Sequence, residues 1–120
     1  MDIRHSDGGI EVICGGMFAG KTEELIRRIT RIRLAKREVL VFKPIIDDRY
    51  SVTEVVSHSQ RKIKSISVKN SKEIMDYIDK MPYAVAIDEA QFFDEGIIEV
   101  AEYLANHGVR VIVAGLDLDF

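Results

Sequence analysis

Short apolar runs that alternate with helical patterns constrain most strongly what this chain can fold into. Four runs are almost continuously apolar: residues 9–14, 38–43, 83–87 and 109–116. Strands that are buried on both faces have this pattern, whereas a half-exposed strand alternates apolar and polar residues. Between the runs, the spacing of apolar residues predicts a helix at 21–37, and further helices are expected at 70–79 and 96–106. This alternation predicts an α/β fold, with a mostly parallel sheet and helices on both of its faces.

The remaining segments have weaker signals. Residues 45–60 are predicted to form a polar, mobile loop, and residues 62–68 alternate as a half-exposed or edge strand does. Asn70 and Glu73 have the spacing of a helix-capping pair, so we expect a helix to begin there. Gly108 is the expected stop of the last helix.

Composition limits the function classes. The chain has 120 residues, enough for one domain, and a net charge of −3. That charge argues against a nucleic-acid or anionic-membrane partner. No signal peptide or apolar run of about 20 residues is evident. The single cysteine, Cys14, allows no disulfide within the chain. We therefore expect a cytoplasmic protein, with Cys14 as a small buried residue.

Residues 15–22 read GGMFAGKT and match the phosphate-binding pattern G-x-x-x-x-G-K-S/T in full. Glycines allow a tight turn in which successive backbone N–H groups point at an anion, and the following helix adds its positive end. Lys21 is expected to contact the β and γ phosphates, and the Thr22 hydroxyl a Mg²⁺ ion. The pattern lies between a predicted strand and a predicted helix, as a P-loop NTPase (RecA-like) core requires.

A pair of acidic residues follows the apolar run at 83–87 and forms a second candidate site. Asp88 is well placed to hold Mg²⁺ at the end of that strand. Glu89 beside it is the candidate general base, which would take a proton from an attacking hydroxyl. Ligands in parallel sheets bind beyond the carboxyl ends of the strands, where the glycine loop, the acidic pair and residues 117–120 are all expected to lie.

Four segments together resemble one family. GGMFAGKTEELIRR, DDRYS, IDEAQFF and AGLDLDF, in this order, are similar to the zinc-containing, tetrameric thymidine kinases. The resemblance covers nearly the whole chain. It implies transfer of the γ-phosphoryl group of ATP, with Mg²⁺, to the 5′-hydroxyl of thymidine, giving thymidine monophosphate in pyrimidine salvage.

The resemblance also implies roles for individual residues. Glu89 would be the catalytic base, and Thr22 with Asp88 would hold the metal. The expected ATP-binding residues are Gly15, Gly16, Met17, Phe18, Ala19, Gly20, Lys21, Thr22, Asp47, Asp48, Arg49, Asp88, Ala90 and Gln91. The expected thymine-pocket residues are Met17, Phe92, Leu116 and Phe120. For each pocket residue, packing in the core is the alternative interpretation.

Thymidine and ATP are the expected partners, and the resemblance implies a homotetramer. Complete members of the family carry a zinc site of four cysteines, for which this chain contains no ligands. We therefore expect residues 1–120 to be a P-loop nucleotide-binding domain that is truncated at its C-terminal end.

Two other classes remain open. IDEAQ also resembles the acidic box of NTP-driven motors and helicases, which need a second lobe and a nucleic-acid track. An inactive nucleotide-binding fragment would bind ATP without transferring a phosphoryl group. A basic run on the helix at 21–37 is expected to be a solvated face or a subunit contact.

Overall fold

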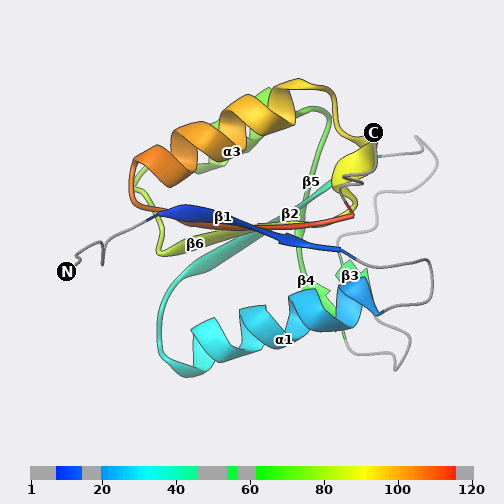
Figure 1. Ribbon diagram of the computed structural model, residues 1–120, viewed down its shortest axis with the longest axis vertical. Helices are drawn as coiled ribbons and strands as arrows, with labels where there is room; N and C mark the ends of the chain where they lie inside the picture. Colours follow the sequence, from blue (N-terminus) through cyan, green and yellow to red (C-terminus); the bar gives the residue numbers. More distant parts are fainter. Residues whose placement is uncertain (1–7, 15–19, 46–53, 57–61, 116–120) are drawn as a thin grey trace.

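The computed structural model describes residues 8–14, 20–45, 54–56 and 62–115 (Figure 1). Its centre is a five-stranded parallel sheet in the order β1-β7-β6-β2-β5. The strands are β1 (Gly9–Ile13), β2 (Val39–Pro44), β5 (Ile66–Val68), β6 (Ala84–Ile87) and β7 (Arg110–Ala114). The predicted parallel α/β fold is therefore confirmed.

Helices cover both faces of the sheet. Helix α1 (Lys21–Leu34) lies on one face, and α3 (Gly96–Asn106) lies on the other (Figure 1). The short helix α2 (Ser71–Ile74) packs beside α3. The chain moves from β1 across to β2 through α1, then returns from β5 to β6 and β7 through α2 and α3. Because crossovers between parallel strands are right-handed, opposite directions of travel put the helices on opposite faces.

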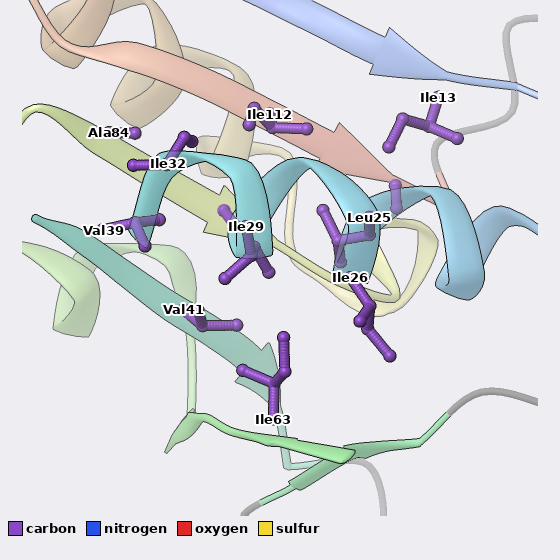
Figure 2. Close-up of a cluster of buried hydrophobic side chains, with 12 residues drawn as sticks. Ile13, Leu25, Ile26, Ile29, Ile32, Val39, Val41, Ile63, Ala84 and Ile112 are labelled. Atoms are coloured by element: carbon purple, nitrogen blue, oxygen red, sulfur yellow. The ribbon is translucent and has the colours of Figure 1, made fainter. Parts of the chain in front are cut away.

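The first core cluster joins α1 to the sheet. Leu25, Ile29 and Ile32 recur at helical spacing on α1 and are almost fully buried. Figure 2 shows these side chains where α1 meets the sheet, with Ile26 on the side of the helix towards Ile63. Their sheet partners are small or β-branched: Ile13, Val39, Val41, Ala84, Ala86, Ile112 and Ala114. Small residues on β6 and β7 allow α1 to approach the sheet closely.

The second core cluster lies on the opposite face. Alternate residues of the same strands point there, as the twofold period of a strand requires. The strands contribute Phe42, Val85, Ile87, Val111 and Val113, and the helices contribute Ile74, Ile97, Ala101 and Leu104. Because the central strands are apolar on both faces, their sequences do not alternate between apolar and polar residues.

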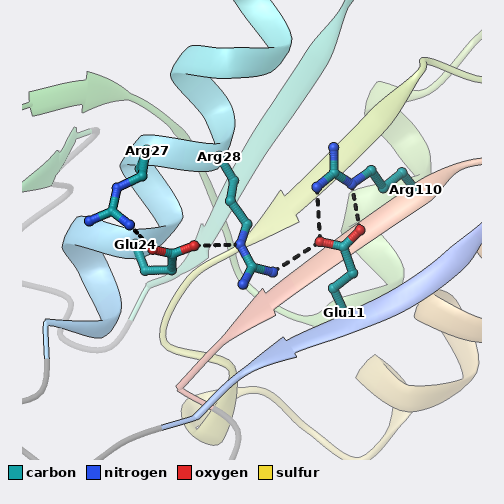
Figure 3. Close-up of polar contacts among 5 residues, drawn as sticks. All are labelled: Glu11, Glu24, Arg27, Arg28 and Arg110. Carbon is teal, nitrogen blue, oxygen red and sulfur yellow. Dashed lines mark hydrogen bonds and ion pairs between the residues drawn. The ribbon is translucent and has the colours of Figure 1, made fainter.

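A chain of ion pairs ties the N-terminal half of α1 to the sheet (Figure 3). Arg110 of β7 donates two hydrogen bonds to Glu11 of β1. Arg28 of α1 donates to Glu11 at 2.9 Å and to Glu24 at 2.8 Å, and Arg27 donates to Glu24 at 2.7 Å. These bonds set α1 relative to the strand that precedes it. They therefore help to position the first turn of α1.

Several predicted boundaries are corrected. The helix predicted at 21–37 ends at Leu34, and Lys36 adopts a left-handed conformation with φ 61°. The predicted loop at 45–60 contains strand β3 (Glu54–Val56). β3 pairs antiparallel with β4 (Lys62–Lys64), so the strand predicted at 62–68 is split into β4 and β5. β3 and β4 form a local hairpin of two three-residue strands, which are too short for the sequence pattern to separate them from their neighbours.

The predictions at two helix ends are confirmed, and the prediction for Cys14 is wrong. The Asn70 side chain accepts a hydrogen bond from the Glu73 N–H at 2.9 Å, and Gly108 has φ 87°. The helix predicted at 70–79 is shorter, because α2 passes into the 3₁₀ turn η2 (Met75–Tyr77). Cys14 is exposed, since it follows the last paired residue of an edge strand. No helix in the described part of the chain is long and apolar enough to cross a membrane.

Candidate functional site

The candidate site lies at the carboxyl edge of the parallel sheet. Asp88 and Glu89 follow β6, Gly115 follows β7, and α1 begins shortly after β1. Strand β7 lies between β1 and β6, so the carboxyl ends of these three strands are neighbours. The following predicted residues lie outside the described part of the chain: Gly15, Gly16, Met17, Phe18, Ala19, Asp47, Asp48, Arg49, Leu116 and Phe120.

The start of α1 has the features of an anion site. Gly20 precedes the helix with φ 71° and ψ 33°, a left-handed conformation that favours glycine. Its carbonyl accepts the Glu24 N–H at 2.9 Å, which begins the helix. Among the described residues, no side chain caps the N–H groups of this first turn. Free amides and the positive end of the helix dipole attract phosphate groups.

Asp88 is a buried carboxylate that is fixed from two sides. Its N–H donates to the Phe42 carbonyl at 2.9 Å, and its Oδ1 accepts the Glu89 N–H at 2.9 Å. Burial is the main cause that raises the pKa of Asp88 to about 6. The hydrogen bond from the Glu89 N–H lowers this pKa, whereas the nearby negative charge of Glu89 raises it further. Lys43 and Lys21 lower the pKa of Asp88, so both cations lie within electrostatic range of this carboxylate.

Glu89 adopts an uncommon backbone conformation. Its φ of 53° and ψ of 43° are left-handed, which costs a non-glycine residue about 1–3 kcal/mol. The chain then turns into the 3₁₀ segment η3 (Ala90–Phe92), where the Phe92 N–H donates to the Glu89 carbonyl at 3.0 Å. The Glu89 carboxylate lies 3.7 Å from Nζ of Lys43 and is one-third exposed. A partly exposed carboxylate at a strand end is accessible to a ligand.

Gly115 allows β7 to pass close to this turn. It has φ 94°, and a Cβ atom there would lie 2.3 Å from Oε1 of Gln91 and 3.1 Å from the Ala90 nitrogen. Only glycine fits this close backbone approach without displacing the turn that carries Glu89.

The other described site residues differ in exposure. Ala90 is buried beneath the turn, whereas Gln91 and Phe92 are exposed. The Phe92 side chain is 56% exposed, which excludes the interpretation of this residue as part of the core. An exposed aromatic ring beside the acidic pair is free to contact a ligand.

Asp94 fixes the far end of the same loop. Both Asp94 carboxylate oxygens are used: Oδ1 accepts the Ser71 N–H at 2.8 Å, and Oδ2 accepts the Ser71 hydroxyl at 2.7 Å. Oδ2 also accepts the Gly96 N–H at 3.2 Å. Asp94 therefore joins the starts of α2 and α3, and residues 88–94 are held at both ends.

Sequence reasoning missed Lys43, Asp94 and Gly115. Lys43 had a visible signal, because it is a single cation at the end of an otherwise apolar strand. The roles of Asp94 and Gly115 depend on contacts across 23 and about 25 residues of chain, which no local pattern reveals.

A parallel sheet with an uncapped helix start, Lys21 and a buried acid at its carboxyl edge defines a P-loop nucleotide-binding protein. The family model described as thymidine kinase matches residues 8–120. The chain therefore belongs to the thymidine kinase family. Membership supports a kinase role, with a nucleoside as the acceptor of the phosphoryl group.

Proposed function

We propose that this protein transfers the γ-phosphoryl group of ATP to the 5′-hydroxyl of thymidine, as a cytoplasmic enzyme of pyrimidine salvage. The observation that carries the proposal is the position of Lys21, at the open start of α1, within electrostatic range of Asp88. A phosphate-binding helix start opposite a strand-end acid is the arrangement that phosphoryl transfer needs. Family membership supports a nucleoside as the acceptor.

The described residues fit a Mg²⁺-bound triphosphate. Asp88 is a buried carboxylate with a second carboxylate, Glu89, directly beside it, so a cation here would relieve local negative charge. Carboxylate and hydroxyl oxygens are ligands that Mg²⁺ prefers, which makes Asp88 and Thr22 the proposed metal-side residues. When bound, Mg²⁺ would neutralise charge on the phosphate oxygens. The amides after Gly20 and the Lys21 ammonium would hold the same phosphates.

Glu89 is the proposed general base. Its carboxylate would accept the proton of the 5′-hydroxyl as that oxygen bonds to the γ-phosphorus and the bond to ADP breaks. Its partial exposure leaves room for the acceptor. Phe92, exposed beside it, offers an aromatic face against which a pyrimidine can stack.

The test is acceptor-dependent turnover of Mg·ATP by the full chain. Four reactions are compared: no acceptor, thymidine, deoxyuridine and a single-stranded polynucleotide. The proposal predicts ADP and thymidine monophosphate in equal amounts, with thymidine the preferred acceptor. Stimulation by the polynucleotide alone would identify a motor-type ATPase. Tight ATP binding without transfer to any nucleoside would identify an inactive nucleotide-binding fragment.

A further inference from the structure

Lys43 lies among the proposed site residues, although no motif includes it. It is near the end of β2, and its Nζ lies 3.7 Å from Oε2 of Glu89. Only 13% of the Lys43 side chain is exposed. A lysine this enclosed needs carboxylate partners to offset the loss of hydration. Glu89 is one partner, and the charge of Lys43 also acts on Asp88.

The register of the sheet explains this placement. Phe42 pairs with Ile87, so the next residues on the two strands, Lys43 and Asp88, are neighbours. Lys43 follows Val41 by two residues on β2, so both side chains point to the same face of the sheet. Val41 packs against α1, the helix that begins with Lys21. Lys43 therefore lies near the carboxyl end of β2, next to the turn that carries Glu89.

We propose that Lys43 is a positioning residue that holds the Glu89 carboxylate toward the acceptor hydroxyl, an inference that rests on the proposed function. A glutamate side chain has three rotatable bonds, so the backbone conformation of Glu89 alone does not fix its carboxylate. A cation at 3.7 Å attracts the carboxylate but is too far away for a direct hydrogen bond. Lys43 therefore uses no lone pair of the carboxylate in a direct hydrogen bond.

This role differs from that of Lys21. Lys21 belongs to the turn that binds phosphates, and its loss should weaken the binding of ATP. Lys43 rises from a strand and faces the acidic pair, so its loss should leave both substrates bound but misplace the base. Misplacement of a catalytic group by about 1 Å can cost on the order of 10²-fold in rate.

The experiment measures kcat and KM for thymidine and for ATP in Lys43→Met, Lys43→Gln and Lys43→Arg. We expect kcat to fall about 10- to 100-fold in the Met and Gln variants, with both KM values within about threefold of wild type. Lys43→Arg keeps the charge and should restore most of kcat. Lys72→Met, which changes an exposed lysine of α2, is the matched control and should match wild type.

A double-mutant cycle with Glu89→Gln identifies the route of the effect. If Lys43 acts through Glu89, adding Lys43→Met to Glu89→Gln should cause little further loss of kcat. If the losses of kcat in the two single variants multiplied in the double variant, the inference would be overturned. An unchanged kcat in Lys43→Met, or an effect only on the KM for ATP, would overturn it as well. Wild-type protein without nucleoside-dependent turnover would instead overturn the proposed function, and the inference with it.

Discussion

Gly115 lies against the backbone of Glu89: a Cβ atom at position 115 would be only 3.1 Å from the Glu89 α-carbon. The end of β7 therefore supports the turn that carries the proposed base. Because β7 is paired with β6, this contact joins the ends of two neighbouring strands at the acidic pair. The geometry of the site depends on a residue that has no side chain.

Gly115→Ala should therefore damage both stability and activity. Alanine is strained at φ 94° and its Cβ meets the turn, so we expect the free energy of unfolding to fall by about 1–3 kcal/mol. Turnover should fall about tenfold or more, because Glu89 is displaced. Gly9→Ala is the matched control, since nothing lies within 4 Å of its added Cβ. Equal effects of the two substitutions in denaturation and turnover assays would contradict this account.

Asp88 should make stability depend on pH. Burial raises its pKa from 3.8 to about 6, so the folded protein binds the proton more tightly than the unfolded chain does. The resulting stabilisation is fully present below about pH 4 and is lost as the pH rises through about 6. Asp88→Asn removes this titration but keeps an oxygen that can accept the Glu89 N–H.

Chemical denaturation of both proteins in metal-free buffer checks this prediction. Between pH 4 and pH 7.5, wild type should lose about 2 kcal/mol of stability relative to Asp88→Asn. Parallel pH curves for the two proteins would show that Asp88 titrates normally. A wild type that gains stability relative to the variant as pH rises would reverse the sign and contradict the burial argument.

The Glu11 network should contribute to the stability of the fold. Glu11→Ala leaves Arg28 and Arg110 without this carboxylate. Because these groups are only about one-third exposed, we expect the free energy of unfolding to fall by about 1–2 kcal/mol. Hydrogen bonding to Arg110 is the main cause that lowers the pKa of Glu11, so this stabilisation is present above about pH 4.5 and lost in acid. Thermal unfolding of Glu11→Ala and of Glu102→Ala, an exposed control on α3, tests the difference.

Glu89→Gln should separate binding from turnover. Glutamine keeps the size of the side chain but cannot act as a base at neutral pH, so kcat should fall about 10²- to 10⁴-fold. The affinity for ATP should change little, because Glu89 is proposed to act on the acceptor hydroxyl rather than on the phosphates. Single-turnover kinetics with radiolabelled ATP measure both quantities. Full activity in this variant would place the base elsewhere.

The sequence predicted the parallel sheet because its central strands are buried on both faces and are therefore continuously apolar. It also located Asp88 and Glu89, since a strand end is visible as the point where the apolar run stops. It failed where structure depends on distant partners. The contact of Gly115 with Glu89 and the approach of Lys43 to Glu89 each join segments that are far apart in the chain. The β3–β4 pair is a local hairpin, but each of its strands has only three residues, too few to show a clear pattern.

We propose that the start of α1 and the acidic end of β6 together form one site for Mg·ATP. Isothermal titration of the folded wild-type chain with Mg·ATP tests it most directly, alongside Lys21→Ala. We expect saturable binding to wild type and at least tenfold weaker binding to the variant, because the cation on the β and γ phosphates is lost. Absence of binding to the folded wild type, or equal affinity for both proteins, would contradict the claim.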